Sequence, residues 1–153
     1  MTVRQGVSLV TLLWLGVQSP AAGATRVIVE PFAGKPGAAE LRAELIRLLG
    51  RERAVIVVSD PSSAELDVSG DGETYITGYV GANPRVRYLN SDARPVYRGF
   101  LSVELKNHAH DTIWSYLVTP RRLGPDDINR NLAGQIVRRL VEAVEKQQRA
   151  PAP

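Results

Sequence analysis

The chain of 153 residues contains no cysteine. It therefore forms no disulfide bond, offers no thiolate to a metal ion, and has no cysteine to carry a lipid after an export signal. Only two histidines are present, so a three-histidine metal site is excluded as well. The fold must be held together by its hydrophobic core, which a composition of 44% hydrophobic residues can supply.

The chain also has no large excess of positive or negative charge and no apolar run long enough to cross a membrane. The net charge is only +3, and this near balance argues against a nucleic-acid partner. The apolar run at 7–17 is shorter than the roughly 20 residues that a membrane helix needs. It follows Arg4 and precedes small residues at 22–24, which is typical of a signal peptide. We predict a leader over 1–24 cleaved after Ala24, no membrane span after cleavage, and a periplasmic or secreted protein.

The first half of the remaining chain predicts a strand, a helix and a second strand. Residues 26–30 form a short β-branched run, and residues 54–58 are apolar at every position, as in a strand buried on both faces or covered by a helix. Between them, an amphipathic helix is predicted over roughly 37–49. Its apolar stripe is formed by leucines, Leu41, Leu45, Leu48 and Leu49. This order indicates a βαβ unit, or a split pair with another strand between the two.

The second half is rich in alternating patterns that predict antiparallel strands. Residues 66–80 form two strands, or one long strand with a bend at 70–72. A polar, basic loop follows over 81–94. Residues 95–106 alternate apolar and polar, with Phe100 as the exception on the polar side. A tight polar connection at 107–111 then leads to a returning strand over 112–118.

Proline and acidic residues at 125–127 begin a long final helix, where they match the helix dipole and the unpaired amides. Its apolar stripe comprises Ile128, Leu132, Ile136, Val137, Leu140, Val141 and Val144. We therefore predict a single α/β domain over 25–146 and a disordered tail over 147–153. The fold class is an α+β layer sandwich, with a mixed sheet of about five strands and two amphipathic helices packed on one face.

Residue types that could perform chemistry do not converge in the sequence. His108, His110 and Asp111 could bind a metal or act as a base, but they fall where a hairpin must turn. The chain has no Gly-x-Ser-x-Gly elbow and no phosphate-loop lysine. The acidic residues at 67, 71 and 73 would share one solvated face of a strand. We predict that the protein is not an enzyme and holds no cofactor and no metal.

Two sets of residues are candidates for binding. The first surrounds the long loop and combines arginine with tyrosine, residue types that favour protein interfaces. It comprises Arg85, Arg87, Tyr88, Arg94, Tyr97 and Arg98. The alternative is a solvated loop whose arginines keep the chain soluble. The second set is aromatic, Tyr75, Tyr79, Trp114 and Tyr116, and indicates either sheet packing or a stacking surface for a ligand.

The order of several short motifs resembles a known group of proteins. Val-Ile-Val-Glu-Pro-Phe opens the chain after the leader, Ala-Val-Ile-Val-Val-Ser follows the first helix, and Ser-Ala-Glu-Leu-Asp-Val-Ser-Gly runs into Thr-Gly-Tyr-Val. The last hairpin carries Ile113 and Trp114. This order resembles the small α/β envelope domains of the TolB amino-terminal, curli-secretion (CsgG) and penicillin-binding-protein-activator (LpoB) group, over about 25–146.

That resemblance implies a non-enzymatic domain that binds other envelope proteins or assembles with copies of itself. The chain departs from the group in lacking a lipid-attachment cysteine and the second domain of TolB. The predicted function is a periplasmic or envelope adaptor or assembly domain that acts through protein–protein interaction. The alternative is a periplasmic protein that binds a small ligand or a polysaccharide.

Overall fold

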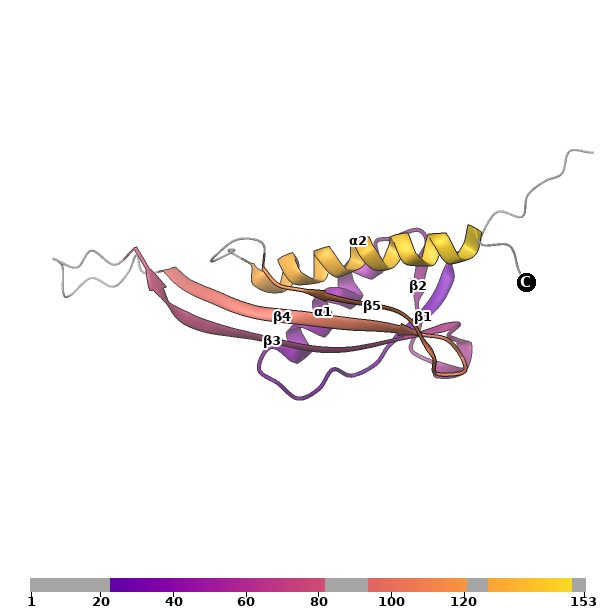
Figure 1. Ribbon diagram of the computed structural model, residues 1–153, viewed down its shortest axis with the longest axis horizontal. Coiled ribbons are helices and arrows are strands. Elements are labelled where there is room, and N and C mark those ends of the chain that lie inside the picture. Colours follow the sequence, from indigo (N-terminus) through magenta and orange to yellow (C-terminus); the bar gives the residue numbers. More distant parts are fainter. Residues whose placement is uncertain (1–22, 82–93, 121–126, 150–153) are drawn as a thin grey trace, which may run out of the picture.

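The fold is a single layer of helices on a single β-sheet (Figure 1). It was obtained as a computed structural model, which describes residues 23–81, 94–120 and 127–149. The predicted leader, apart from its last two residues, lies outside these ranges. The elements in chain order are β1 (Thr25–Val29), α1 (Ala38–Leu49), β2 (Val55–Val57), a 3₁₀ turn (Pro61–Ser63), β3 (Leu66–Val80), β4 (Arg94–Lys106), β5 (Thr112–Val118) and α2 (Ile128–Arg149).

The five strands form one mixed sheet in the order β2-β1-β3-β4-β5. β1 pairs in parallel with β2 on one side and with β3 on the other, whereas β3, β4 and β5 pair antiparallel. β1, α1 and β2 therefore make a βαβ unit of adjacent strands, and the split-pair alternative is wrong. The predicted mixed sheet of five strands with two helices against it is confirmed.

Both helices bury one stripe against the same face of the sheet. Leu41, Leu45 and Leu49 of α1 are fully buried, as are Leu132, Ile136 and Leu140 of α2. They meet the inward-facing residues of the central strands, Val27, Val68, Leu101, Val103 and Leu105, which are also inaccessible to solvent. The apolar strand β2 is covered on this face only, because Val55 is buried while Ile56 is 49% exposed.

The last helix begins where the sequence predicts but ends later. Asp127 caps it, since its carboxylate accepts the backbone N–H of Arg130 at 2.9 Å. The helix continues to Arg149, so the tail predicted to start at residue 147 is wrong for its first three residues. Gln148 explains the extension, because its amide donates to the Thr25 hydroxyl at 2.7 Å and to the Gly23 carbonyl at 3.1 Å. Residues 150–153 lie outside the described ranges.

None of the helices in the described ranges combines the length and the apolar character that crossing a membrane would require.

The segment between β1 and α1 covers the free edge of β3. Glu30 donates its backbone N–H to the Val68 carbonyl, and Thr74 donates its own to the Pro36 carbonyl at 3.0 Å. Lys35 pairs with Asp71 at 2.7 Å and lies over the Phe100 ring at 5.1 Å. Phe100, the apolar exception on the polar side of its strand, is thereby covered by a lysine from a distant part of the chain.

Gly37, immediately before α1, is required by its backbone conformation and by its neighbour. Its φ is +77°, and an added Cβ would lie 2.0 Å from the Thr74 hydroxyl oxygen. We expect Gly37→Ala to lower the free energy of unfolding by about 1–3 kcal/mol. Gly34→Ala, three residues away with nothing within 4 Å, is the matched control. Urea denaturation of both variants measures the difference, and equal stabilities would contradict the assignment.

Candidate functional site

The most exposed part of the sheet is a two-stranded extension of β3 and β4. β1 pairs with β3 only as far as Val68, and β5 pairs with β4 only from Leu101 onward. Beyond these points Tyr75–Val80 and Arg94–Arg98 pair with each other alone among the described strands. Figure 1 shows the two strands projecting together past the helices. We call these two segments the ribbon.

A β-bulge lies in the middle of the ribbon. Ile76 pairs with Tyr97 and Gly78 pairs with Val96, so Thr77 is the extra residue. The Thr77 hydroxyl donates to the Val96 carbonyl at 3.1 Å, which holds the bulge in place. The two strands pair without a register shift across 70–72, where the sequence had suggested a bend. Bulges bend a strand and re-aim its side chains, so the outer half of the ribbon presents its residues at a new angle.

Large apolar side chains gather on the ribbon and face solvent. Among the described residues, seven large hydrophobic side chains are exposed, and four of them lie here. Tyr79 and Val80 are 64% and 58% exposed, and Tyr75 and Ile76 are almost half exposed. Scattered exposed hydrophobic residues are ordinary, but four on one projecting segment, two on each of its faces, mark that segment as a candidate interaction site.

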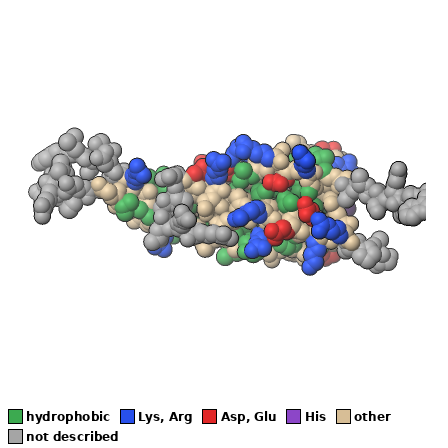
Figure 2. Space-filling view, turned by 90° about the horizontal axis from the view of Figure 1, so that it is seen from above, with side chains coloured by type: hydrophobic (Ala, Val, Ile, Leu, Met, Phe, Trp, Pro, Cys, Tyr) green, Lys and Arg blue, Asp and Glu red, His purple; other side chains and the backbone are tan. Residues whose placement is uncertain are grey.

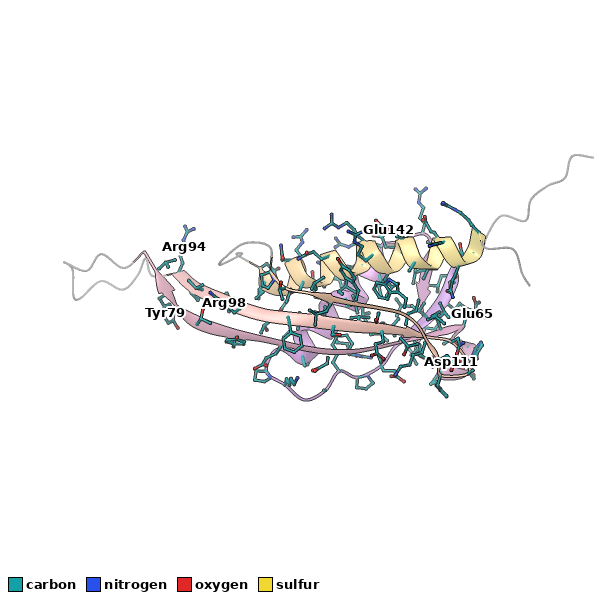
Figure 3. All side chains as sticks on the ribbon, viewed as in Figure 1. Glu65, Tyr79, Arg94, Arg98, Asp111 and Glu142 are labelled. Carbon is teal, nitrogen blue, oxygen red and sulfur yellow. The ribbon has the colours of Figure 1, made fainter. Side chains whose placement is uncertain are left out.

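The ribbon also carries positive charge without any acidic residue. Arg94 and Arg98 are exposed, and neither forms an ion pair with another described residue. Figure 3 shows Tyr79, Arg94 and Arg98 together near the tip of the described strands. Arginine and tyrosine are enriched among the residues that contribute most of the binding energy of protein interfaces.

The predicted partner-binding residues are partly brought together. Arg94, Tyr97 and Arg98 lie on β4 within the ribbon, with Arg94 already in the strand rather than in the predicted loop. Arg98 pairs with Tyr75 on the face turned away from the helices, while Tyr97 packs against the core from the other face. The remaining predicted residues, Arg85, Arg87 and Tyr88, lie outside the described ranges. The sequence prediction missed Ile76 and Val80 and assigned Tyr79 only to the aromatic set. The sequence assigns β3 to the sheet but does not show that the neighbouring strands β1 and β5 end early.

The four aromatic residues of the alternative hypothesis do not form one surface. Trp114 and Tyr116 stack on β5, with ring centroids 6.0 Å apart and planes inclined by 19°. Tyr75 and Tyr79 lie instead on the ribbon. They pair with Arg98 and Pro95, which are three residues apart in β4 and so point to opposite faces. No hollow described in the structure is lined by all four.

Two hollows lie between β5 and α2, one beside each ring of the Trp114–Tyr116 stack, and we call the two together the groove. Arg139 lies over the Tyr116 ring at 5.7 Å and pairs with Glu142 at 3.2 Å. The hydrogen bond to Glu142, with a smaller contribution from Tyr116, raises the pKa of Arg139 above its ordinary value. The hollow beside Tyr116 has a volume of about 130 Å³, and the hollow beside Trp114 has a volume of about 330 Å³.

A third hollow, of about 500 Å³ and larger than the two beside α2, lies at the carboxyl ends of β1 and β2. Three of its four charged side chains, Arg42, Asp67 and His110, have partners, and Glu30 is the fourth. Arg42 donates to the carbonyl oxygens of Val29 at 2.6 Å and Glu30 at 2.9 Å, and His110 lies 3.8 Å from the Asp67 carboxylate. The hollow therefore has an apolar wall and no convergent set of free polar groups among the described residues.

The predicted turn around the two histidines is confirmed. The Asn107 side-chain oxygen accepts the backbone N–H groups of Ala109 and Asp111, both at 2.9 Å, and His110 adopts a positive φ of 61°. Asparagine stabilises tight turns by such bonds. Within the described ranges, no three histidine or acidic side chains lie close enough together to hold a metal ion.

Comparisons with known proteins give a fold but no family. No protein-family model matches the chain, and no curated protein matches it. A crystal structure from Xanthomonas campestris, of family-model DUF330, superposes with a TM-score of 0.54 at 12% identity, covering 86% of this chain and 93% of that one. The PelC dodecamer from Paraburkholderia phytofirmans gives a TM-score of 0.45 at 15% identity, covering 80% and 89%.

A third structure, the uncharacterized lipoprotein B from Nitrosomonas europaea, gives a TM-score of 0.37 at 15% identity, covering 82% of this chain and 81% of that one. At these identities the comparisons reach no further than architecture. The specific resemblance to the TolB, CsgG and LpoB group stays a prediction. The chain shares its fold with the small α/β protein from Xanthomonas campestris.

Proposed function

We propose that this protein is a non-enzymatic adaptor or assembly domain of a bacterial envelope, exported to the periplasm or secreted, and that the ribbon is its main binding surface. One observation carries the proposal. Tyr75, Ile76, Tyr79 and Val80 expose apolar side chains on a segment that projects from an otherwise well-packed domain. Burying the exposed part of these side chains against a partner favours a complex by about 25 cal/mol for each Å² of apolar surface removed from water, before the costs of association.

The shape of the ribbon supports a protein partner over a small ligand. A small-molecule site is concave and encloses most of its ligand, whereas these side chains stand on a projecting two-stranded segment. Arg94 and Arg98 pair with no acidic group among the residues that the structure describes, and their charge favours a partner surface with acidic groups around an apolar centre. Export to the envelope rests on the predicted leader.

A double variant of the ribbon tests this function. We expect Ile76→Ser with Tyr79→Ser to weaken binding to the envelope partner on the order of tenfold to a hundredfold, because two apolar contacts are lost. The measurement is quantitative co-purification of envelope proteins with the tagged protein, followed by titration of the recovered partner. Both positions are about half exposed or more, so the stability of the domain should change little.

The matched control changes an exposed apolar residue elsewhere on the sheet. Ile56 on β2 is 49% exposed, against 47% for Ile76, so Ile56→Ser removes a similar side chain without touching the ribbon or β5. This control should retain the partner. A loss from Ile56→Ser equal to that from the ribbon variant, or no loss from either, would show that the ribbon is not the binding surface.

A Gly/Ser replacement of 82–93 tests the part of the prediction that lies outside the described ranges. If Arg85, Arg87 and Tyr88 contribute contacts, binding should weaken even with the ribbon strands intact. Unchanged binding would show that these three residues are not part of the binding surface, which would then consist of the ribbon strands alone.

A further inference from the structure

The two edges of the sheet differ in how they are protected. β2 is only three residues long, and a short edge offers little to another strand. β5 has seven residues, Thr-Ile-Trp-Ser-Tyr-Leu-Val, and pairs with β4 alone among the described strands. It contains no charge and no proline, two of the devices that usually prevent edge-to-edge pairing, and its bulge at Ile113 leaves Trp114–Val118 paired with β4 in regular register. Its outer edge is therefore a favourable template for an added strand.

The helix-facing side of β5 has features that an added strand could use. Side chains of a strand alternate between faces, so every second residue of an added strand would lie beside Trp114 and Tyr116. These two rings stand between the two hollows of the groove along α2. The hollow beside Trp114 has apolar walls that include Leu105, Ile113 and Ala143. An extended segment with apolar residues at alternate positions fits this groove.

The charges along the groove select the occupant. Its lining includes Arg138, Arg139 and Lys146 against a single acidic residue, Glu142. Glu142 already pairs with Arg139, while Arg138 and Lys146 form no ion pair with the described residues. Figure 2, which looks onto the helical layer, shows Lys and Arg side chains spread along it. The groove therefore keeps an excess of positive charge that acidic side chains of a partner can neutralise.

We propose that the outer edge of β5 binds an extended, acidic segment of another protein as a sixth strand. Backbone hydrogen bonds to β5 provide affinity, and apolar residues beside Trp114 and Tyr116, with acidic residues beside Arg138 and Lys146, provide specificity. A second copy of this chain is disfavoured, because pairing two β5 edges about a two-fold axis draws two basic groove linings together. This surface is separate from the ribbon and does not depend on it.

The test uses the purified protein and three synthetic eight-residue probes. One probe alternates glutamate with valine or isoleucine, the second carries lysine in place of each glutamate, and the third is the acidic probe with two central prolines. Titration is followed by the backbone amide signals of Thr112–Val118 in NMR spectra. We expect the acidic probe to shift these signals and to slow their hydrogen exchange. The basic probe and the proline probe should have little effect.

A charge reversal in the groove sharpens the test. Arg138→Glu with Lys146→Glu should weaken the affinity for the acidic probe on the order of tenfold and raise the affinity for the basic probe. Arg130→Glu, on the same helix but in neither hollow, is the matched control and should bind normally. The ribbon variant Ile76→Ser with Tyr79→Ser should also bind the acidic probe normally, so failure here is distinguishable from failure of the ribbon proposal.

Three results would overturn the proposal. The first is no shift of the β5 amides by the acidic probe at about 1 mM, the concentration of a weak complex. The second is equal binding of the acidic and basic probes. The third is a shift of the same amides when the protein alone is concentrated, together with a doubled mass in solution, which would identify a second copy as the occupant.

Discussion

Leu140→Ala is expected to lower the free energy of unfolding by about 2–5 kcal/mol. Leu140 lies near the middle of α2, is fully buried, and belongs to the core cluster that joins both helices to the sheet. Truncation removes apolar contacts and leaves a cavity that two packed layers can only partly close. Because the chain has no disulfide to support it, such a loss is a large fraction of the stability of a domain of this size.

Urea denaturation monitored by circular dichroism measures this effect as a shift in midpoint at unchanged slope. Arg138→Ala, two residues away on the same helix but exposed, is the matched control and should remain within about 0.5 kcal/mol of the parent. If Leu140→Ala were as mild as the control, α2 would not be packed as described.

Gly99→Ala is expected to have the second large effect, because it forces the strands apart at the base of the ribbon. A Cβ on Gly99 would lie 2.1 Å from the carbonyl oxygen of Glu73 and 3.0 Å from Thr74. The nearest atom belongs to the backbone, which cannot move away as the end of a flexible side chain can. We expect a loss of about 1–3 kcal/mol in the free energy of unfolding, with faster amide exchange in the ribbon.

Gly78→Ala provides the comparison within the same ribbon. A Cβ there meets nothing within 4 Å, and alanine in a strand should be neutral or stabilising by about 0.5–1 kcal/mol relative to glycine. The two variants add the same methyl group at positions that are three residue pairs apart in the β3–β4 ladder. Equal stabilities and equal exchange rates would therefore contradict the strand pairing described here.

Much of the fold was predictable from periodicity alone. The leucine stripe of α1 and the mixed aliphatic stripe of α2 both face the sheet, and the alternation over 95–106 places Leu101, Val103 and Leu105 in the core. Periodicity reports which face of an element is buried, and this is a local property. Strand order was not predictable, because several arrangements of the same strands bury the same faces.

Contacts between distant segments account for what the sequence did not reveal. The glycines at 70 and 72 suggested a bend, but their bare Cα atoms instead admit the Phe32 ring and the Leu41 side chain, since a Cβ would lie 2.6 and 2.8 Å from them. The helix extension to Arg149 likewise depends on Thr25, more than a hundred residues away. Such long-range packing leaves no periodic signal.

The candidate site was predictable in composition but not in geometry. Arginine and tyrosine around residues 94–98 indicated an interface, and these residues do lie on the exposed ribbon. Exposure of Tyr79 and Val80 follows from the early ends of β1 and β5, which only the pairing reveals. A strand with apolar residues on both faces ordinarily indicates a buried position, so the sequence alone favoured packing over binding.

Site-specific photo-crosslinking from the ribbon tests the central claim most directly. A photoreactive phenylalanine analogue replaces Tyr79 in one sample and Ile56 in another, two exposed positions on different parts of the sheet and both outside β5. In cells of the source organism, irradiation should join Tyr79-substituted protein to one discrete envelope protein, and that adduct should disappear when Ile76→Ser is added. An adduct only from position 56, or the same adducts from both positions, would contradict the assignment of the ribbon as the binding surface.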